Sequence, residues 1–261
     1  MAATGVRPVA ALPGVIWAQV RGNLLGFRRQ PAFVVFSLVL PLMFYAFFGG
    51  IFGGSKVGST TIYTFLLASY GSYAMGSIMV FNIGINMAQQ RARKLDLLQR
   101  ATPLPGWVAI LAQVVSAVAL GCLTLLVLFV YAYIVGKVRL DVGHAALLLL
   151  ALIFGALPLL GLGLAIGYGA TASSAPALAN LIYLPMSFLS GIFLPLSLLP
   201  GWIRNIAQVV PTYHYAQLAW STVGAGDEAI WKSILWLAGW ALVLFLIAAR
   251  VYRREARLKF S

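Results

Sequence analysis

The sequence predicts an all-α polytopic membrane protein, and its composition, the length of its apolar stretches and the position of its charges all favour that class. Of the 261 residues, 62% are hydrophobic and 9% are charged, and the mean hydropathy is +0.95. A soluble domain has about 25% charged residues, so the composition excludes an ordinary soluble domain. We expect a single transmembrane domain over residues 1–261.

Six stretches are apolar over about the 20 residues that a helix needs to cross a bilayer. The predicted spans cover residues 32–52, 60–87, 107–135, 145–170, 175–194 and 234–249. Only residues 171–174 separate the fourth span from the fifth. Pro41, Pro158 and Pro185 each remove a backbone donor, so we expect kinks in the first, fourth and fifth spans. Glycines along the second and fourth spans predict close helix packing.

The basic residues divide unequally between the two sides of the predicted membrane. Thirteen of the 18 Lys and Arg residues precede the first span, follow the second or follow the sixth, and the other five lie on the opposite side. Cytoplasmic loops carry the excess of Lys and Arg, so we expect both termini to be cytoplasmic. The expected location is the inner (plasma) membrane of the cell.

The net charge of +13 is confined to loops and chain ends. A nucleic-acid-binding protein would gather such charge on one soluble face. Basic loops beside a membrane are explained by orientation and by anionic lipid. We therefore expect membrane lipid as a partner, and no nucleic acid.

Residues 14–30 form an amphipathic segment ahead of the first span. Val20 and Leu24 stand at loosely helical spacing against Gln19 and Arg21. A helix with one apolar face and a basic polar face lies along the membrane interface. We predict an N-terminal interfacial helix on the inner surface.

Residues 89–106 are predicted to form a basic cytoplasmic loop. Leu95, Leu97 and Leu98 stand on a charged background, which indicates a short amphipathic helix that Pro103 ends. A loop that only fixes topology would also be basic, but it would not need these leucines. We interpret the loop as a docking face for a partner, with a topology anchor as the alternative.

Residues 195–222, on the opposite side, are too apolar for a free loop. Pro195, Pro200 and Pro211 break this segment into pieces shorter than a span. We expect two short re-entrant helices that dip into the outer interface, where Trp and Tyr are enriched. His214 is interpreted as a polar interfacial residue, with a proton-linked switch as the alternative.

The sequence contains no recognisable site that could supply the energy for transport. All five acidic residues lie outside the predicted spans: Asp96, Asp141, Asp227, Glu228 and Glu255. A proton pump usually keeps a carboxylate inside a span. The chain has no Gly-x-x-x-x-Gly-Lys-Ser/Thr loop for ATP phosphates and no candidate nucleophile–base pair, triad or metal cluster. We expect no catalytic residue, no metal and no cofactor bound by this chain, and a separate protein that supplies the energy.

Three segments, in their order and spacing, resemble one family. Arg28-Arg29-Gln30-Pro31 precedes a span that contains Pro41, and the basic loop ends in Arg100-Ala101-Thr102-Pro103-Leu104-Pro105. Phe188-Leu189-Ser190-Gly191-Ile192-Phe193-Leu194-Pro195 is followed by Pro211-Thr212-Tyr213-His214. The chain resembles the integral-membrane permease subunit of ATP-binding cassette exporters of the type-2 permease family, and the resemblance covers nearly its whole length.

This resemblance implies partners and sites. A second six-span permease would complete a homodimer or heterodimer, and a separate cytosolic nucleotide-binding ATPase would hold ATP and Mg. By resemblance, the residues that couple to the ATPase are Arg28, Arg29, Arg91, Arg93, Lys94, Asp96 and Arg100. The resemblance also implies an outer gate in residues 195–222, and the gate candidates are Phe193, Trp202 and His214.

Uncharged aromatic and amide side chains are the candidates for a substrate path: Tyr45, Tyr73, Asn82, Asn86, Asn180 and Phe188. Such a lining suits an amphipathic, lipid-like or drug-like molecule better than a small ion. The aromatic residues could instead face lipid or neighbouring helices. For the chain as a whole, the alternatives are a secondary transporter, which would need inverted repeats with broken helices, and a membrane assembly factor without an ATPase partner.

Overall fold

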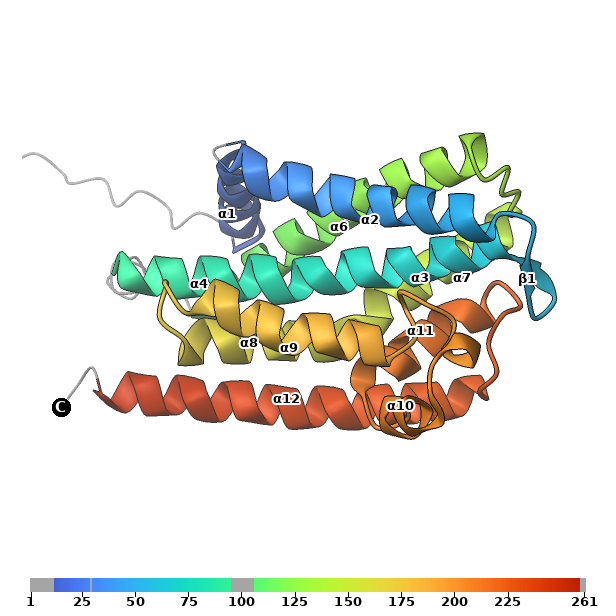
Figure 1. The fold of residues 1–261 in the computed structure, drawn as a ribbon. Helices are drawn as coiled ribbons and strands as arrows, with labels where there is room; N and C mark the ends of the chain where they lie inside the picture. The colour runs from blue at the N-terminus through green and yellow to red at the C-terminus, as the bar shows by residue number, and fades with distance from the viewer. Residues whose placement is uncertain (1–11, 29, 95–105, 259–261) are drawn as a thin grey trace, which may run out of the picture.

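The structure, a computed structural model, describes residues 12–28, 30–94 and 106–258 and consists of long helices packed side by side (Figure 1). The first half contains α1 (Leu12–Phe27), α2 (Pro31–Phe52), α3 (Ile62–Ser77), the π-helix η1 (Ile78–Asn82), α4 (Ile83–Ala92) and α6 (Gly106–Ile134). The second half contains α7 (Val142–Gly155), α8 (Leu157–Gly169), α9 (Ala175–Leu189), the 3₁₀-helix η2 (Leu196–Leu198), α10 (Gly201–Ala207), α11 (Pro211–Ser221) and α12 (Ile230–Leu258). A short antiparallel hairpin of β1 (Lys56–Val57) and β2 (Thr60–Thr61) joins α2 to α3. Apart from this hairpin, the architecture agrees with the predicted all-α class.

Five helical segments of the described chain are long and apolar enough to cross a membrane: Phe33–Phe52, Ile62–Ala92, Trp107–Ile134, Val142–Gly169 and Ile230–Glu255. They correspond to the predicted spans one to four and six. The fifth predicted span, residues 175–194, is represented by α9, which has 15 residues. At about 22 Å, α9 is shorter than the hydrocarbon core of about 30 Å. The six-span count therefore remains a prediction.

Helix α9 ends earlier than its hydropathy suggests. The apolar residues continue to Leu194, but Gly191 adopts a φ of +82°. Glycine in this left-handed conformation is a common end to a helix. The chain turns at Gly191 and leads into η2. Residues 190–194 therefore form a turn after α9 and do not extend the helix.

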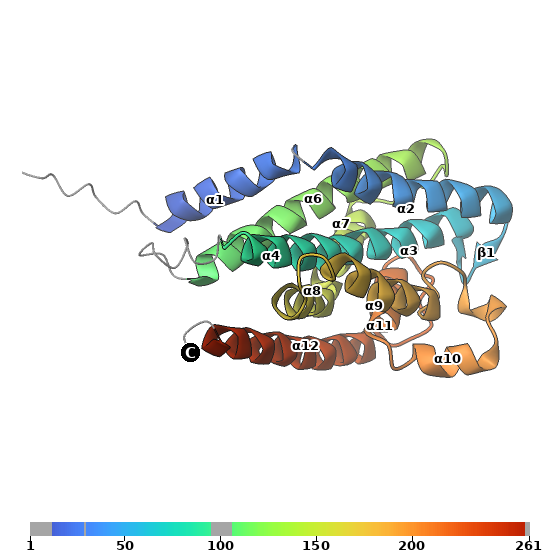
Figure 2. The same cartoon turned by 60° about the vertical axis from the view of Figure 1, so that its left-hand side comes forward.

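One nearly continuous helix, α3–η1–α4, runs through the middle of the bundle and is called the central helix below. It is buried along most of its length, with α2, α6, α8 and α9 around it (Figure 1 and Figure 2). Its small polar residues tolerate burial because they bond to their own backbone. Ser72 Oγ donates to the Ala68 carbonyl and Ser77 Oγ to the Ala74 carbonyl, both at 2.8 Å, so neither hydroxyl is unsatisfied.

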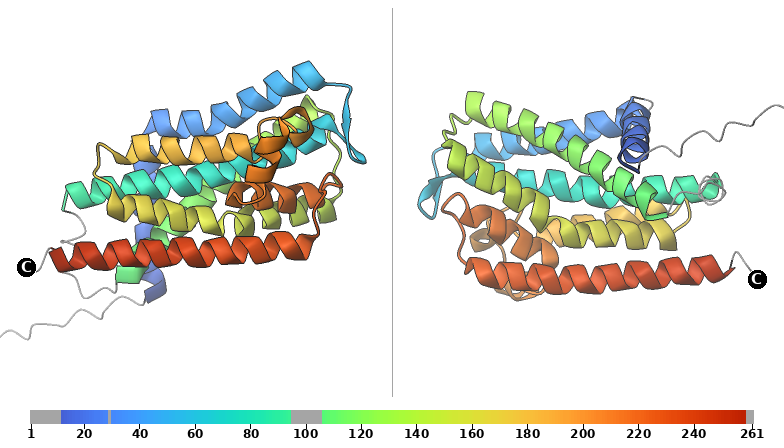
Figure 3. Two further views of the ribbon diagram at one scale, coloured as in Figure 1. Left: turned by 60° about the horizontal axis from the view of Figure 1, so that its bottom comes forward. Right: turned by 180° about the vertical axis from the view of Figure 1, so that it is seen from behind.

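The fourth predicted span is interrupted, as its proline predicts. Helix α7 ends at Gly155 and α8 begins at Leu157, with Pro158 in the first turn of α8. Helix α8 then packs between the central helix and α12 (Figure 3). A Cβ atom at Gly163 of α8 would come within 2.3 Å of the Met79 carbonyl oxygen. Glycine therefore sets the distance between α8 and the central helix.

The segment between α9 and α12 is partly interior. Every residue of α11 from Pro211 to Gln217 is buried, because α11 packs among α3, α7, α9 and α12 (Figure 1). Tyr215 Oη donates to the Leu152 carbonyl at 2.6 Å, and Trp220 Nε1 donates to Ser69 Oγ at 2.8 Å. The two predicted short helices thus exist as α10 and α11, and their depth in a membrane stays a prediction.

The two ends of the bundle are both positively charged, but to different degrees. Helix α1, the end of α4 and the last turns of α12 lie at one end, which we call the basic end (Figure 1). The Lys and Arg residues of these segments within the described ranges are Arg21, Arg28, Arg91, Arg93, Lys94, Arg250, Arg253, Arg254 and Arg257. The hairpin, α10 and the start of α12 lie at the other end, called the hairpin end. Its cations are Lys56, Lys137, Arg139, Arg204 and Lys232.

Candidate functional site

The predicted coupling residues that the structure describes gather at the basic end. Arg28 is exposed near the end of α1, and Arg93 and Lys94 are exposed just after α4. Three predicted members lie outside the described residues: Arg29, Asp96 and Arg100. Arg28, Arg93 and Lys94 therefore present exposed cationic side chains on two neighbouring segments.

Arg91, the remaining predicted coupling residue, is engaged within the chain. Its Nε donates to Glu255 Oε1 at 2.7 Å, and its Nη1 donates to the carbonyl oxygens of Gly167 at 2.7 Å and Ala170 at 3.2 Å. These carbonyls lie at the C-terminal end of α8, where intrahelical donors run out. We call these contacts the arginine clasp. The clasp joins α4, α8 and α12 at the basic end.

Loss of the clasp is expected to destabilise the bundle. Arg91→Met should lower the free energy of unfolding by about 2 kcal/mol, because it removes the guanidinium from a mostly buried carboxylate and from two carbonyls at the end of α8. Glu255→Gln should cost about 1 kcal/mol, since Arg91 keeps its two carbonyls. Thermal unfolding of the purified protein in detergent measures both changes. Arg253→Met, at an exposed cation of α12, is the control, and an equal loss in Arg253→Met and Arg91→Met would contradict the clasp.

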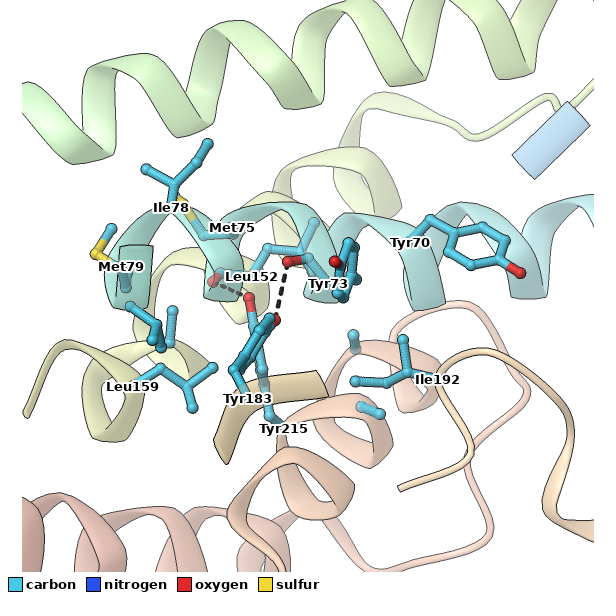
Figure 4. Packing of buried hydrophobic residues seen from close by; sticks show 14 of the residues in the cluster. Tyr70, Tyr73, Met75, Ile78, Met79, Leu152, Leu159, Tyr183, Ile192 and Tyr215 are labelled. Atoms are coloured by element: carbon cyan, nitrogen blue, oxygen red, sulfur yellow. Dashed lines mark hydrogen bonds between the residues drawn. The ribbon is translucent and has the colours of Figure 1, made fainter. Parts of the chain in front are cut away.

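An uncharged groove of about 220 Å³ lies between α2, the central helix and α9. Its lining residues are Phe33, Phe36, Ser37, Leu40, Pro41, Tyr73, Ser77, Phe81, Ile85, Asn180 and Leu184. Tyr73 is held in place by Tyr183, whose ring stacks on it with centroids 5.6 Å apart and whose Oη donates to the Tyr73 carbonyl at 2.9 Å (Figure 4). The groove is thus a fixed apolar surface with a few hydroxyl and amide groups.

The predicted path residues do not form one surface. Tyr73 and Asn180 line the groove. Asn82 and Asn86 line a different, polar cavity on another face of the central helix. Tyr45 is completely buried against other aromatic rings and lines neither space. Hydropathy alone could not separate these faces, because the central helix is buried on all sides.

Phe193, a predicted gate residue, is the centre of an aromatic cluster next to the groove. Its ring centroid lies 4.4 Å from that of Phe188, 5.0 Å from that of Phe44 and 5.0 Å from that of Tyr73. Tyr70 Oη donates to the Phe193 carbonyl at 3.2 Å. Aromatic pairs of this kind add about 0.5–1.5 kcal/mol each beyond their burial. The cluster joins α2 and α3 to the turn that follows α9.

The other two gate residues lie in different environments. Trp202 is 62% exposed on α10, whereas His214 is 1% exposed. His214 Nδ1 lies 2.8 Å from a carboxylate oxygen of Glu228, and Nε2 lies 2.9 Å from the Gln208 carbonyl oxygen. The ring also stacks on Trp236, with centroids 4.9 Å apart. Each of the two ring nitrogens therefore faces an oxygen atom within hydrogen-bond distance.

Sequence reasoning missed the partners of His214. Glu228 stands in a loop 14 residues further along the chain, and no helical spacing links the two. Glu228 also accepts from Ser233 Oγ at 2.7 Å and pairs with Lys232 Nζ at 2.8 Å. Glu228 therefore has a structural partner, His214, that only the folded chain reveals.

Comparison with known proteins agrees with this architecture. A family model described as ABC-2 type transporter matches residues 14–222. The chain is 28% identical over 227 residues to "Putative transport permease YvfS" of Bacillus subtilis (strain 168), an alignment that covers 87% of this chain and 92% of that protein. It is 32% identical over 115 residues to "Inner membrane transport permease YhhJ" of Escherichia coli (strain K12), over 38% of this chain and 31% of that protein. Since the family match extends over most of its helices, the chain belongs to the ABC-2 type transporter family.

Proposed function

We propose that this chain is the permease subunit of an ATP-driven exporter that moves an amphipathic, lipid-like or drug-like substrate. Family membership and the similarity to proteins named as transport permeases support the transport role. The single observation that carries the substrate class is the groove between α2, the central helix and α9. Uncharged walls with a few fixed polar groups suit a molecule that is apolar over most of its surface.

A second permease would complete the groove from outside. Phe36 and Phe47 on α2 are 70% and 60% exposed, and Leu181 on α9 is 72% exposed. Phe36 lines the groove, and all three apolar side chains need either lipid or protein against them. A second copy of this chain, or a related permease, would cover this face and leave the groove as part of a shared path.

Energy would come from a cytosolic nucleotide-binding ATPase that holds ATP and Mg. The exposed cations Arg28, Arg93 and Lys94 form the docking surface in this proposal, which puts the basic end and both termini in the cytoplasm and the protein in the inner membrane. The arginine clasp would transmit a movement of α4 to α8 and α12, because it joins the three helices. Such rigid-body movement is a common form of switching between two states.

Charge reversal at the basic end tests the coupling. In the complete complex in lipid vesicles, Arg93→Glu/Lys94→Glu is expected to reduce substrate-stimulated ATP hydrolysis about tenfold or more. The ATPase surface that attracts the two cations would repel the two carboxylates that replace them. Lys56→Glu/Lys137→Glu makes the same change of charge at the hairpin end and should leave stimulation intact. Unchanged stimulation in the first variant would contradict the docking surface.

The substrate class is tested with the same assay. Amphipathic lipids and drugs should stimulate hydrolysis, and Ser77→Trp, which puts a bulky ring in the groove, should abolish that stimulation while ATPase binding persists. Stimulation by small ions alone, or full stimulation in Ser77→Trp, would contradict an amphipathic substrate in the groove.

A further inference from the structure

A second cavity lies toward the basic end of the bundle, apart from the groove. It has a volume of about 170 Å³ and is bounded by α1, the end of the central helix and α6. It shares no lining residue with the groove: Phe81 and Ile85 line the groove, whereas Asn82 and Asn86 line this cavity. The central helix therefore separates an apolar compartment from a polar one.

The cavity is rich in side-chain amides, and we call it the amide cavity. Its polar lining includes Asn23, Gln30, Asn82, Asn86, Gln113 and Arg93. These residues come from α1, the loop before α2, α4 and its end, η1 and α6. Gln30 Nε2 donates to Asn86 Oδ1 at 3.4 Å across the cavity wall, and Ser116 Oγ of α6 donates to the Val20 carbonyl of α1 at 3.5 Å. The first contact joins the loop before α2 to α4, and the second joins α6 to α1, which packs on α6.

Two buried amide donors of this cavity have no hydrogen-bond partner among the described residues. They are Asn82 Nδ2 and Gln113 Nε2, on side chains that are 2% and 5% exposed. An unsatisfied buried polar group costs about 1–3 kcal/mol, and most buried polar groups in folded proteins are paired. Two such donors in one cavity point to a ligand that brings acceptor oxygens.

The position of Asn82 adds to this argument. It is the last residue of η1, the π-helical turn inside the central helix. Such turns are rare and occur frequently at functional sites. The irregular turn therefore coincides with one of the two unsatisfied donors.

The charge of the residues that line the amide cavity limits the chemical class of the ligand further. Among the described residues, Arg93 is the only charged residue that lines the cavity, and none of the lining residues is a carboxylate. A guanidinium with amide N–H groups around it is suited to phosphate oxygens. The amide oxygens of the same side chains accept hydrogen bonds from hydroxyl groups. The matching ligand is a phosphate ester that also carries hydroxyls.

Helix α1 connects the cavity with the membrane surface. Its apolar side chains Leu12, Trp17 and Leu25 are 48%, 65% and 47% exposed, as in a helix that lies with apolar residues in the interface. Its glycines Gly22 and Gly26, one helical turn apart, line the cavity. A lipid at the edge of α1 could thus reach the cavity with its headgroup while its acyl chains stay outside.

We propose that the amide cavity binds the phosphate-and-hydroxyl headgroup of an anionic membrane lipid of the phosphatidylglycerol type. The site is distinct from the groove assigned to the transported substrate, so it concerns a resident lipid at the junction of α1, α4 and α6. Arg93 pairs with the phosphate, and Asn82 and Gln113 donate to its oxygens or to those of the glycerol.

The test is binding of phosphatidylglycerol to the full-length protein purified in detergent, followed by native mass spectrometry. A Cβ atom at Gly26 would meet no other atom within 4 Å, so Gly26→Leu fills the cavity without a clash at its first carbon. Gly26→Leu and Arg93→Gln are each expected to weaken phosphatidylglycerol binding about tenfold, the effect of one charge-assisted hydrogen bond or more. Gly14→Leu is the matched control, because Gly14 is equally open on the same helix and does not line the cavity.

The lipid source is tested by competition with soluble glycerol 1-phosphate and with phosphatidylcholine. Retained phosphatidylglycerol in wild type and Gly14→Leu, its loss in Gly26→Leu, and weak competition by both competitors support the proposal. Wild-type affinity in Gly26→Leu would overturn the site. Displacement by glycerol 1-phosphate at concentrations similar to the lipid's would overturn the membrane lipid as the source.

Discussion

Gly163→Ala is expected to lower the free energy of unfolding by about 3 kcal/mol or more, because the added methyl group would clash with backbone atoms. The new Cβ atom would stand 2.3 Å from the Met79 carbonyl oxygen and 3.3 Å from Val80 Cα. Both atoms belong to the backbone of η1, so no side chain can rotate away. Helix α8 would have to move off the central helix, and its contacts with α4 and α12 would be disturbed together.

Yield in the membrane and thermal unfolding in detergent measure this loss. Gly239→Ala is the matched control, because Gly239 is also inside a long helix and a Cβ atom there would meet nothing within 4 Å. Alanine is favoured over glycine in a helix by about 0.5–1 kcal/mol, so Gly239→Ala should be neutral or slightly stabilising. Normal yield and unfolding temperature in Gly163→Ala would show that glycine does not set the approach of α8.

Hydropathy predicted most of the fold, because a membrane-spanning helix is defined by its length and its apolar side chains. Four of the predicted spans agree with long helices to within a few residues, and Pro158 correctly marked the break between α7 and α8. The end of α9 was harder to predict. Residues 190–194 are as apolar as a span, and only the backbone conformation of Gly191 shows that the helix has already ended.

The candidate site was less accessible to sequence analysis. On a helix with one solvent-exposed face, the spacing of the apolar residues reveals which side chains point inward. The central helix has no such face, so the sequence did not show that Tyr73 and Asn82 point into different spaces. Arg91 looked like a free loop cation because its partners, Glu255 and two α8 carbonyls, are far away in sequence. Contacts over such separations leave no pattern in a single chain.

The group of charges around His214 should make the hairpin end sensitive to acid. Burial opposes ionisation of Glu228, but hydrogen bonds from Lys232, Ser233 and His214 outweigh it and lower the Glu228 pKa from its ordinary value of 4.5. A carboxyl with a lowered pKa in the folded protein stabilises it at neutral pH. That contribution declines as the pH falls below about 4.5 through the lowered pKa, because the folded state then has to bind a proton it disfavours.

Glu228→Gln is therefore expected to cost about 2–3 kcal/mol at pH 7, since it removes the charged acceptor from a His214 side chain that is 1% exposed. For a chain of this size that is a fall in unfolding temperature of about 5 °C or more. The difference between wild type and Glu228→Gln should shrink between pH 5 and pH 3, whereas Asp227→Asn, at the exposed neighbouring carboxylate, should behave as wild type throughout. Because the other carboxylates titrate in both proteins, the difference isolates Glu228. A difference that stays constant with pH would mean that Glu228 acts through packing and not through its charge.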